Sequence, residues 1–410
     1  MGIKWVTRMC LLGSLLVSTT AWSAEIHGSS STQFLWYNNQ TINQLDSLNG
    51  QRQFDVAEYL RLGITNIDKA GKFSIYGYGR ISQDFDNGTG GAGRLYYLYG
   101  EYRDLFDKAD IRVGRQFVNV AAGSAVIDGL QLDIKNIGPV GFTLFGGRDV
   151  VFGLSGELGY SWNTDLGMSA YLTGFKQTDA EVSWFRKWDH GNVARDILGV
   201  SGKQYLLNNL KVYGNAKFDL TAETFNEVQA GLKYYPTSNL VFTGEYFQSY
   251  ATFDTTSIYS VFAVNQYEEG VFRVDYTFND MVSINAGYNR QGYGEGAAAN
   301  VYHVGLGVRP IEALRVNVEY DNRTGYYGNT NGVIIDADYA ITKKANIAGG
   351  FTYDVYQRDV MLNDDIARRY WLGGKYKLTD SLAVSGRIQT DVNAQYSHNT
   401  SGRVVFDYNF

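Results

Sequence analysis

The chain has 410 residues and a formal net charge of −6, from 36 basic and 42 acidic side chains. An acidic chain is a poor candidate for binding nucleic acid, so no nucleic-acid partner is expected. With 32 Tyr, 22 Phe and 47 Gly but only 3 Pro, the composition favours many long paired strands over a helical fold, and it excludes a disordered or collagen-like chain.

The N-terminus has the three parts of a cleavable export signal in the expected order. Lys4 and Arg8 supply positive charge, Met9–Val17 is an almost continuous apolar run, and Ala21–Ala24 offers small residues for cleavage. The apolar run is too short to cross a bilayer as a helix. We therefore predict a signal peptide over residues 1–23, with a short buried helix as the alternative.

The single cysteine lies inside that signal. Cys10 leaves with the signal, so the exported chain can form no disulfide, no cysteine-ligated zinc site and no c-type haem attachment. We predict no bound cofactor and no metal.

What runs through residues 24–410 is an alternation of apolar and polar side chains. In the segment 58–64, Leu60, Leu62 and Ile64 share one parity, and Arg61 lies on the other. Side chains of a strand point to opposite faces with period two, so this segment is amphipathic as a strand. The same pattern recurs in FSIYGYGRI (73–81), GLQLDIKN (129–136), LRVNVEYDN (314–322) and LAVSGRIQTDVN (382–393).

A soluble antiparallel sheet could show the same alternation. However, one soluble sheet with this many strands would have to curl, split or leave open edges. Aromatic residues also gather at segment ends, and no later segment approaches 18 consecutive apolar residues. These features favour a transmembrane barrel over the soluble alternative.

The last nine residues, GRVVFDYNF, carry the most specific signal. Phe406, Tyr408 and the terminal Phe410 alternate with Asp407 and Asn409. Together with the export signal and the alternating strands, this ending resembles bacterial outer-membrane β-barrels of the porin type. The resemblance implies that Phe406, Tyr408 and Phe410 form a C-terminal signal read by the barrel assembly machinery, and that the last strand pairs with the first.

The links between segments predict the size of the barrel. Short turns, three of them marked by Pro139, Pro236 and Pro310, alternate with longer polar links. We expect an all-β, up-and-down antiparallel barrel of about 20–22 strands over residues 24–410. Because the alternation begins close to residue 24, we expect no plug domain.

The parity opposite the apolar residues supplies the candidate pore-lining side chains. Their mixed signs suggest a transverse field, or simply a water-filled lining with no specific substrate. The candidates are Arg61, Arg80, Asp133, Arg273, Asp275, Arg315, Glu319, Asp336, Asp338, Arg369, Arg387, Asp391, Arg403 and Asp407.

Two longer stretches, 181–195 and 251–270, carry more aromatic and apolar residues than exposed loops need. Each is interpreted either as an extension of outer hairpins, or as a loop that narrows the pore or docks a partner. The residues concerned are Trp184, Phe185, Arg186, Lys187 and Trp188 in the first stretch and Phe253, Tyr259 and Phe262 in the second.

Catalysis is not predicted, because none of the four histidines lies in a recognisable hydrolase motif. The resemblance implies an outer-membrane porin for passive diffusion of small hydrophilic solutes, with outer-membrane lipid as its surroundings. The alternative is a barrel that sheathes a multihaem c-type cytochrome in an electron conduit. A third, less favoured interpretation is a solute-selective channel. A diffusion porin would assemble with two further copies of itself as a homotrimer, whereas a sheath would bind multihaem cytochromes on its periplasmic or outer side.

Overall fold

The computed structural model describes the chain over residues 24–42, 48–87, 91–153, 162–257, 265–357, 364–394 and 397–410. The predicted signal peptide lies outside these ranges. Within them the chain forms twenty-two strands in a single sheet.

The first eleven strands are β1 (Glu25–Ile42), β2 (Leu48–Thr65), β3 (Phe73–Asp84), β4 (Ala92–Leu105), β5 (Ala109–Val120), β6 (Gly123–Ile137), β7 (Val140–Asp149), β8 (Thr164–Phe175), β9 (Thr178–Asp189), β10 (Asn192–Leu206) and β11 (Leu210–Asp219). The second eleven are β12 (Thr224–Thr237), β13 (Leu240–Ser249), β14 (Tyr267–Asn279), β15 (Val282–Gly292), β16 (Ala298–Ile311), β17 (Leu314–Gly325), β18 (Thr330–Thr342), β19 (Ala345–Tyr356), β20 (Asp365–Lys377), β21 (Leu382–Val392) and β22 (Asn399–Asn409).

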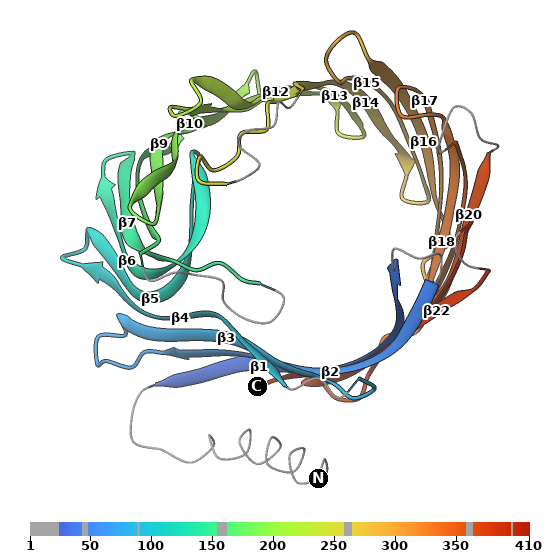
Figure 1. Ribbon diagram of the computed structural model, residues 1–410, viewed down its shortest axis with the longest axis horizontal. Coiled ribbons are helices and arrows are strands. Elements are labelled where there is room, and N and C mark those ends of the chain that lie inside the picture. Colours follow the sequence, from blue (N-terminus) through green and yellow to red (C-terminus); the bar gives the residue numbers. More distant parts are fainter. Residues whose placement is uncertain are drawn as a thin grey trace.

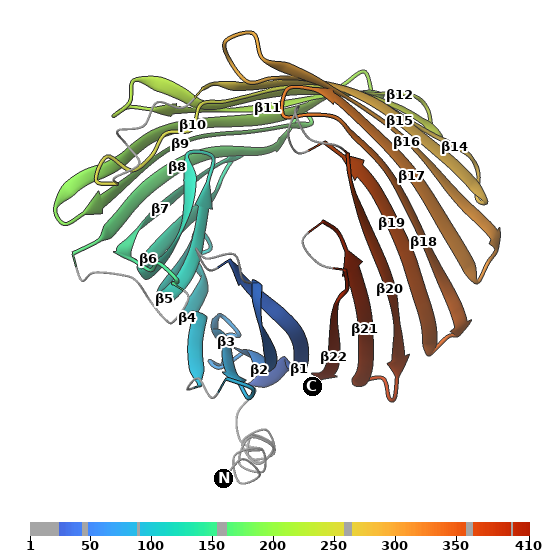
Figure 2. The same cartoon turned by 45° about the vertical axis from the view of Figure 1, so that its right-hand side comes forward.

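The sheet closes into a barrel. Each strand pairs antiparallel with the next one along the chain, and β22 pairs back to β1, with Ser29 opposite Asn409 and Trp36 opposite Gly402. Figures 1 and 2 show the ring from two directions, with the blue β1 beside the red β22. The described residues contain no separate plug domain. The predicted fold class and strand number are therefore confirmed.

The pairing register assigns each strand residue to one of two faces, because directly opposite residues in an antiparallel ladder point to the same side. One face carries large exposed apolar side chains such as Leu60, Phe272 and Leu372. The other face includes Phe145 and Phe185, which pack against the hairpin formed by β5 and β6. Because that hairpin lies inside the ring in Figure 1, the second face is the inner one.

The two rims of the barrel differ. One rim, here the turn rim, holds short links such as Gly138-Pro139 and the C-terminal Phe410. Gly138 has a φ of +63°, which a glycine adopts without steric cost. The other rim, the loop rim, holds the longer links that follow β7 and β13.

Exposed aromatic side chains border the outward apolar band at both rims. Such paired girdles are typical of barrels whose outer face contacts lipid. Near the turn rim they are Phe106, Phe175, Tyr234, Phe278, Tyr376 and Tyr408, and near the loop rim they are Tyr246, Tyr288, Tyr302, Tyr320 and Tyr370.

Candidate functional site

The register places all fourteen candidate pore-lining residues on the inner face. On β17 and β18, for example, Arg315 lies opposite Asp338, and on β21 and β22 Arg387 lies opposite Arg403. None of the fourteen is buried, and Arg61, Arg315, Glu319, Arg369, Arg387 and Arg403 are exposed. The inner face is therefore accessible to water and carries charge.

Basic side chains outnumber acidic ones on one wall of the inner face, from β20 through β22 and β1 to β4. The basic residues of this wall are Arg61, Arg80, Arg94, Arg103, Arg369, Lys375, Lys377, Arg387 and Arg403, and its acids are Glu25, Asp55, Asp84, Glu101, Asp365, Asp391 and Asp407. Asp391 is neutralised by Arg369, whose Nε lies 2.6 Å from its Oδ1. The guanidinium of Arg387 stacks 4.2 Å from the ring centre of Trp371.

Acidic side chains dominate the neighbouring wall, from β14 to β19. The acids of this wall are Glu269, Asp275, Glu319, Asp321, Asp336, Asp338 and Asp354, against Arg273, Arg315 and Arg323. Asp336 and Asp338 accept hydrogen bonds from the neutral amides of Asn317 and Asn346, at 2.8 and 2.9 Å. The two signs of charge expected from the sequence are therefore unevenly distributed around the lumen, with an excess of bases on one wall and of acids on the next.

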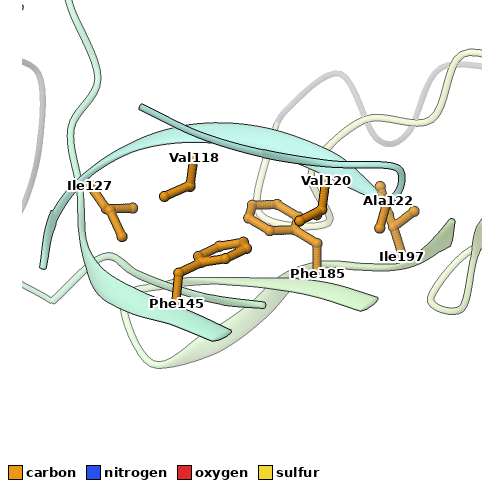
Figure 3. Packing of buried hydrophobic residues seen from close by; sticks show 7 residues of the cluster. All are labelled: Val118, Val120, Ala122, Ile127, Phe145, Phe185 and Ile197. Carbon is orange, nitrogen blue, oxygen red and sulfur yellow. The ribbon is translucent and has the colours of Figure 1, made fainter. Parts of the chain in front are cut away.

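The hairpin of β5 and β6 folds into the lumen and narrows it. Figure 3 shows Val118, Val120 and Ile127 of this hairpin facing Phe145 and Phe185 of the wall. The phenyl rings of Phe145 and Phe185 lie 6.2 Å apart. These residues belong to the one cluster of buried apolar side chains among the described residues, so the barrel's apolar core lies between hairpin and wall.

Polar contacts fix the tip of this hairpin. The amide of Ala121 donates to Glu181 Oε1 and that of Ala122 to Ser183 Oγ, each at 2.7 Å. Gly199 of β10 makes the close approach feasible, because a Cβ there would lie only 2.2 Å from the nitrogen of Ala122. The sequence reasoning missed this constriction; its signal is the run of small residues AAGSA at 121–125.

A buried glutamate, Glu101, forms salt bridges with two arginines at the base of the hairpin. Glu101 of β4 is 1% exposed, and its two carboxylate oxygens contact Arg103 Nε at 2.6 Å and Arg112 Nε at 2.7 Å. Arg112 lies on β5, so this contact joins the hairpin to the basic wall.

A second inward element follows β13. Its described residues run from Ala251 to Ser257 and lie against the loop-rim end of β10. Thr255 donates from its amide to Ala194 O at 2.9 Å and from its hydroxyl to Val193 O at 2.7 Å. In Figure 1 this yellow segment crosses the inner side of the green strands.

The stretch 181–195 differs from the inward loop considered in the sequence analysis. It forms the ends of β9 and β10 and the turn between them, so its side chains alternate between faces. Trp184, Arg186 and Trp188 point outward, with the Arg186 guanidinium 5.1 and 5.7 Å from the two indole rings. Phe185 and Lys187 point inward, because a strand reverses side-chain direction at each residue.

In the second stretch, Phe253 lies in the inward segment and is 38% exposed. Tyr259 and Phe262 lie outside the described residues. The described part of this stretch, Ala251–Ser257, agrees with the interpretation of 251–270 as a loop that narrows the pore.

The C-terminal strand completes the seam. The amide of Gly28 donates to Phe410 O at 2.9 Å, and the amide of Phe410 donates to Gly28 O at 3.1 Å. Phe406, Tyr408 and Phe410 all have exposed rings on the outer face. Assignment of an assembly signal to these rings stays a prediction.

The described residues show neither a metal-binding cluster nor a membrane-spanning helix. They contain no group of three or more His, Cys, Asp or Glu placed to hold a metal ion. They also contain no helix long and apolar enough to cross a membrane.

Comparisons with known proteins agree on the fold. The chain is similar to the crystal structure of a BenF-like porin from Pseudomonas fluorescens Pf-5, with 10% identity, a TM-score of 0.50 and coverage of 95% of this chain and 98% of that one. It is also similar to Pseudomonas aeruginosa OccK2 in complex with glucuronate (11% identity, TM-score 0.48, 95% and 98% coverage) and to Acinetobacter baumannii OccAB2 (10%, 0.49, 95% and 98%). No family model and no curated protein matches the chain. The chain thus has the fold of a porin-type β-barrel.

Proposed function

We propose that the chain is an outer-membrane porin through which small hydrophilic solutes diffuse passively. The observation that carries this proposal is the inner face of the closed barrel, which is charged and accessible to water, while the outer face is apolar. Only a closed barrel or a helix can satisfy its backbone within lipid, and a barrel of this size has room for an aqueous path.

The inward hairpin sets the width of the proposed path. It occupies part of the cross-section and is held by hydrogen bonds and apolar packing. A fixed constriction of this kind favours small solutes. The separation of basic and acidic walls favours solutes that orient in a transverse field over a filter for one sign of charge.

The alternative of a sheath around a multihaem cytochrome is not favoured. A protein partner needs the lumen to be free, whereas here the chain's own hairpin and the segment Ala251–Ser257 lie against the inner wall. No catalytic step is part of the proposal.

A liposome-swelling assay tests this function. Liposomes that contain the purified barrel should swell in iso-osmotic neutral sugars, at a rate that falls steeply as the sugar becomes larger. As a control for correct folding, the protein should migrate differently on a gel before and after heating. Correctly folded protein that admits not even the smallest sugars would contradict the proposed function.

A further inference from the structure

At the loop rim, a group of charged side chains holds the inward segment against the wall. Arg195 of β10 approaches Asp254 with Nε 2.8 Å from Oδ1, and it donates through Nη2 to Thr252 O at 3.1 Å. Lys187 of β9 lies with Nζ 2.8 Å from Asp149 Oδ2 and 3.8 Å from Asp254 Oδ2. Asp149, Lys187, Arg195 and Asp254, here called the rim clamp, therefore join β7, β9 and β10 to the segment.

Asp165 lies beside this clamp. It is the second residue of β8 and lies opposite Lys187 in the ladder. Its side chain points inward at the loop rim, where the outward neighbours on the adjoining strands are Arg148 and Trp188 rather than the apolar band. The site therefore lies beyond the part of the barrel that contacts lipid.

The Asp165 carboxyl is buried beside a second carboxyl, that of Asp149. The residue is 2% exposed, no described group donates a hydrogen bond to its carboxyl oxygens, and when protonated it can donate one to Asp149. Ionising a buried carboxyl that has no hydrogen-bond donor is costly. Burial, and next the neighbouring charge of Asp149, raise the pKa of Asp165 above its usual range.

The charge of Asp165 changes the balance of the clamp. When Asp165 is protonated, two carboxylates face two cations. When it is ionised, three carboxylates compete for the same two cations, and the added charge repels Asp254 and draws Lys187 toward the wall. We propose that Asp165 is a proton-operated lock that tightens the inward segment against β10 when protonated and loosens it when ionised.

The direction follows from linkage. A carboxyl whose pKa is raised in the clamped state favours that state at low pH, and this contribution is lost as the pH rises through the raised value. The titratable groups at the adjoining end of β9 are Asp189 and His190, whose carboxylate and ring nitrogen lie 2.7 Å apart.

Spin-label mobility tests the lock without requiring solute flux. A label on Ser257→Cys, in a chain whose only cysteine, Cys10, is replaced by serine, reports the motion of the segment. We expect a longer correlation time at about pH 5 than at about pH 8. Asp165→Asn should keep the label slow at both values.

Two matched variants separate the lock from other titrating groups. His190→Gln should keep the wild-type pH response, and so should Asp338→Asn, which removes an acid from a different wall. Wild-type mobility that is the same at both pH values, or a pH response that survives in folded Asp165→Asn, would overturn the proposal. The lock regulates a channel only if the proposed function is correct. The two tests are independent, because a negative result in the liposome-swelling assay would not change the pH response of the spin label.

Discussion

Glu101 shows how single residues hold the constriction in place. The charge of its buried carboxylate is balanced by two arginines whose side chains are 51% and 36% exposed. We expect Glu101→Gln to lower the free energy of unfolding by about 1–3 kcal/mol, because two cations lose their counter-ion but can still reach water. The midpoint of urea unfolding measures this change.

Glu319→Gln is the matched control for that experiment. Glu319 is an exposed acid on the inner face and should give a change within about 0.5 kcal/mol. An equal loss of stability in both variants would show that burial of Glu101 is unimportant.

At the same scale, the face of each lumen residue could be predicted from the sequence, because period-two alternation fixes side-chain direction once a strand is recognised. The salt-bridge partners of these residues could not be predicted. Nothing in the sequence around Arg369 indicates that Asp391, on the next strand, neutralises it, since register depends on how the links close.

Among the elements, the inward hairpin gives the sharpest prediction. A Cβ on Gly199 would lie 2.2 to 2.4 Å from backbone atoms of Ala121 and Ala122. Gly199→Ala should therefore displace the hairpin tip from the wall and change single-channel conductance by tens of per cent. The barrel itself should stay folded, because the clash is confined to the hairpin.

Gly202→Ala, on the same strand, provides the comparison. Its nearest contact would be an ordinary 3.5 Å from Asp179 O, so conductance should stay as in the wild type. If Gly199→Ala conducts like Gly202→Ala, the hairpin tip does not set the width of the path.

The strands were predictable from the sequence, and the constriction was not. The stretch 181–195 drew attention through its aromatic residues, yet these continue the alternation of β9 and β10. The hairpin of β5 and β6 alternates like any wall strand, and its inward bend depends on packing against Phe145 and Phe185, which are distant in sequence. The small residues AAGSA at 121–125 mark the tip of the hairpin, but they do not indicate that it bends inward, because the bend depends on this long-range packing.

At the scale of the whole molecule, barrel closure depends on the seam between β1 and β22. Deleting Phe410 removes both backbone hydrogen bonds to Gly28, so we expect less heat-modifiable protein in the outer membrane. Phe410→Ala keeps those bonds but removes the ring. A loss of assembly in Phe410→Ala as well would support a role of the ring as an assembly signal, and normal assembly of both variants would contradict both roles.

The separation of charge between walls also belongs to the whole molecule. Because the basic wall contains the adjacent Arg387 and Arg403, the double variant Arg387→Gln/Arg403→Gln should shift the reversal potential in a salt gradient toward cation preference. Asp336→Asn/Asp338→Asn should shift it the other way. Shifts of the same sign in both variants would contradict a transverse field.

The most direct test of the central claim is the single-channel conductance of the purified wild-type barrel in a planar bilayer. We expect stable, discrete openings with weak ion selectivity, since the lumen is lined by both signs of charge and narrowed by the chain's own hairpin. Silence, or the noisy current of a wide unstable pore, from protein that is correctly heat-modifiable would contradict it.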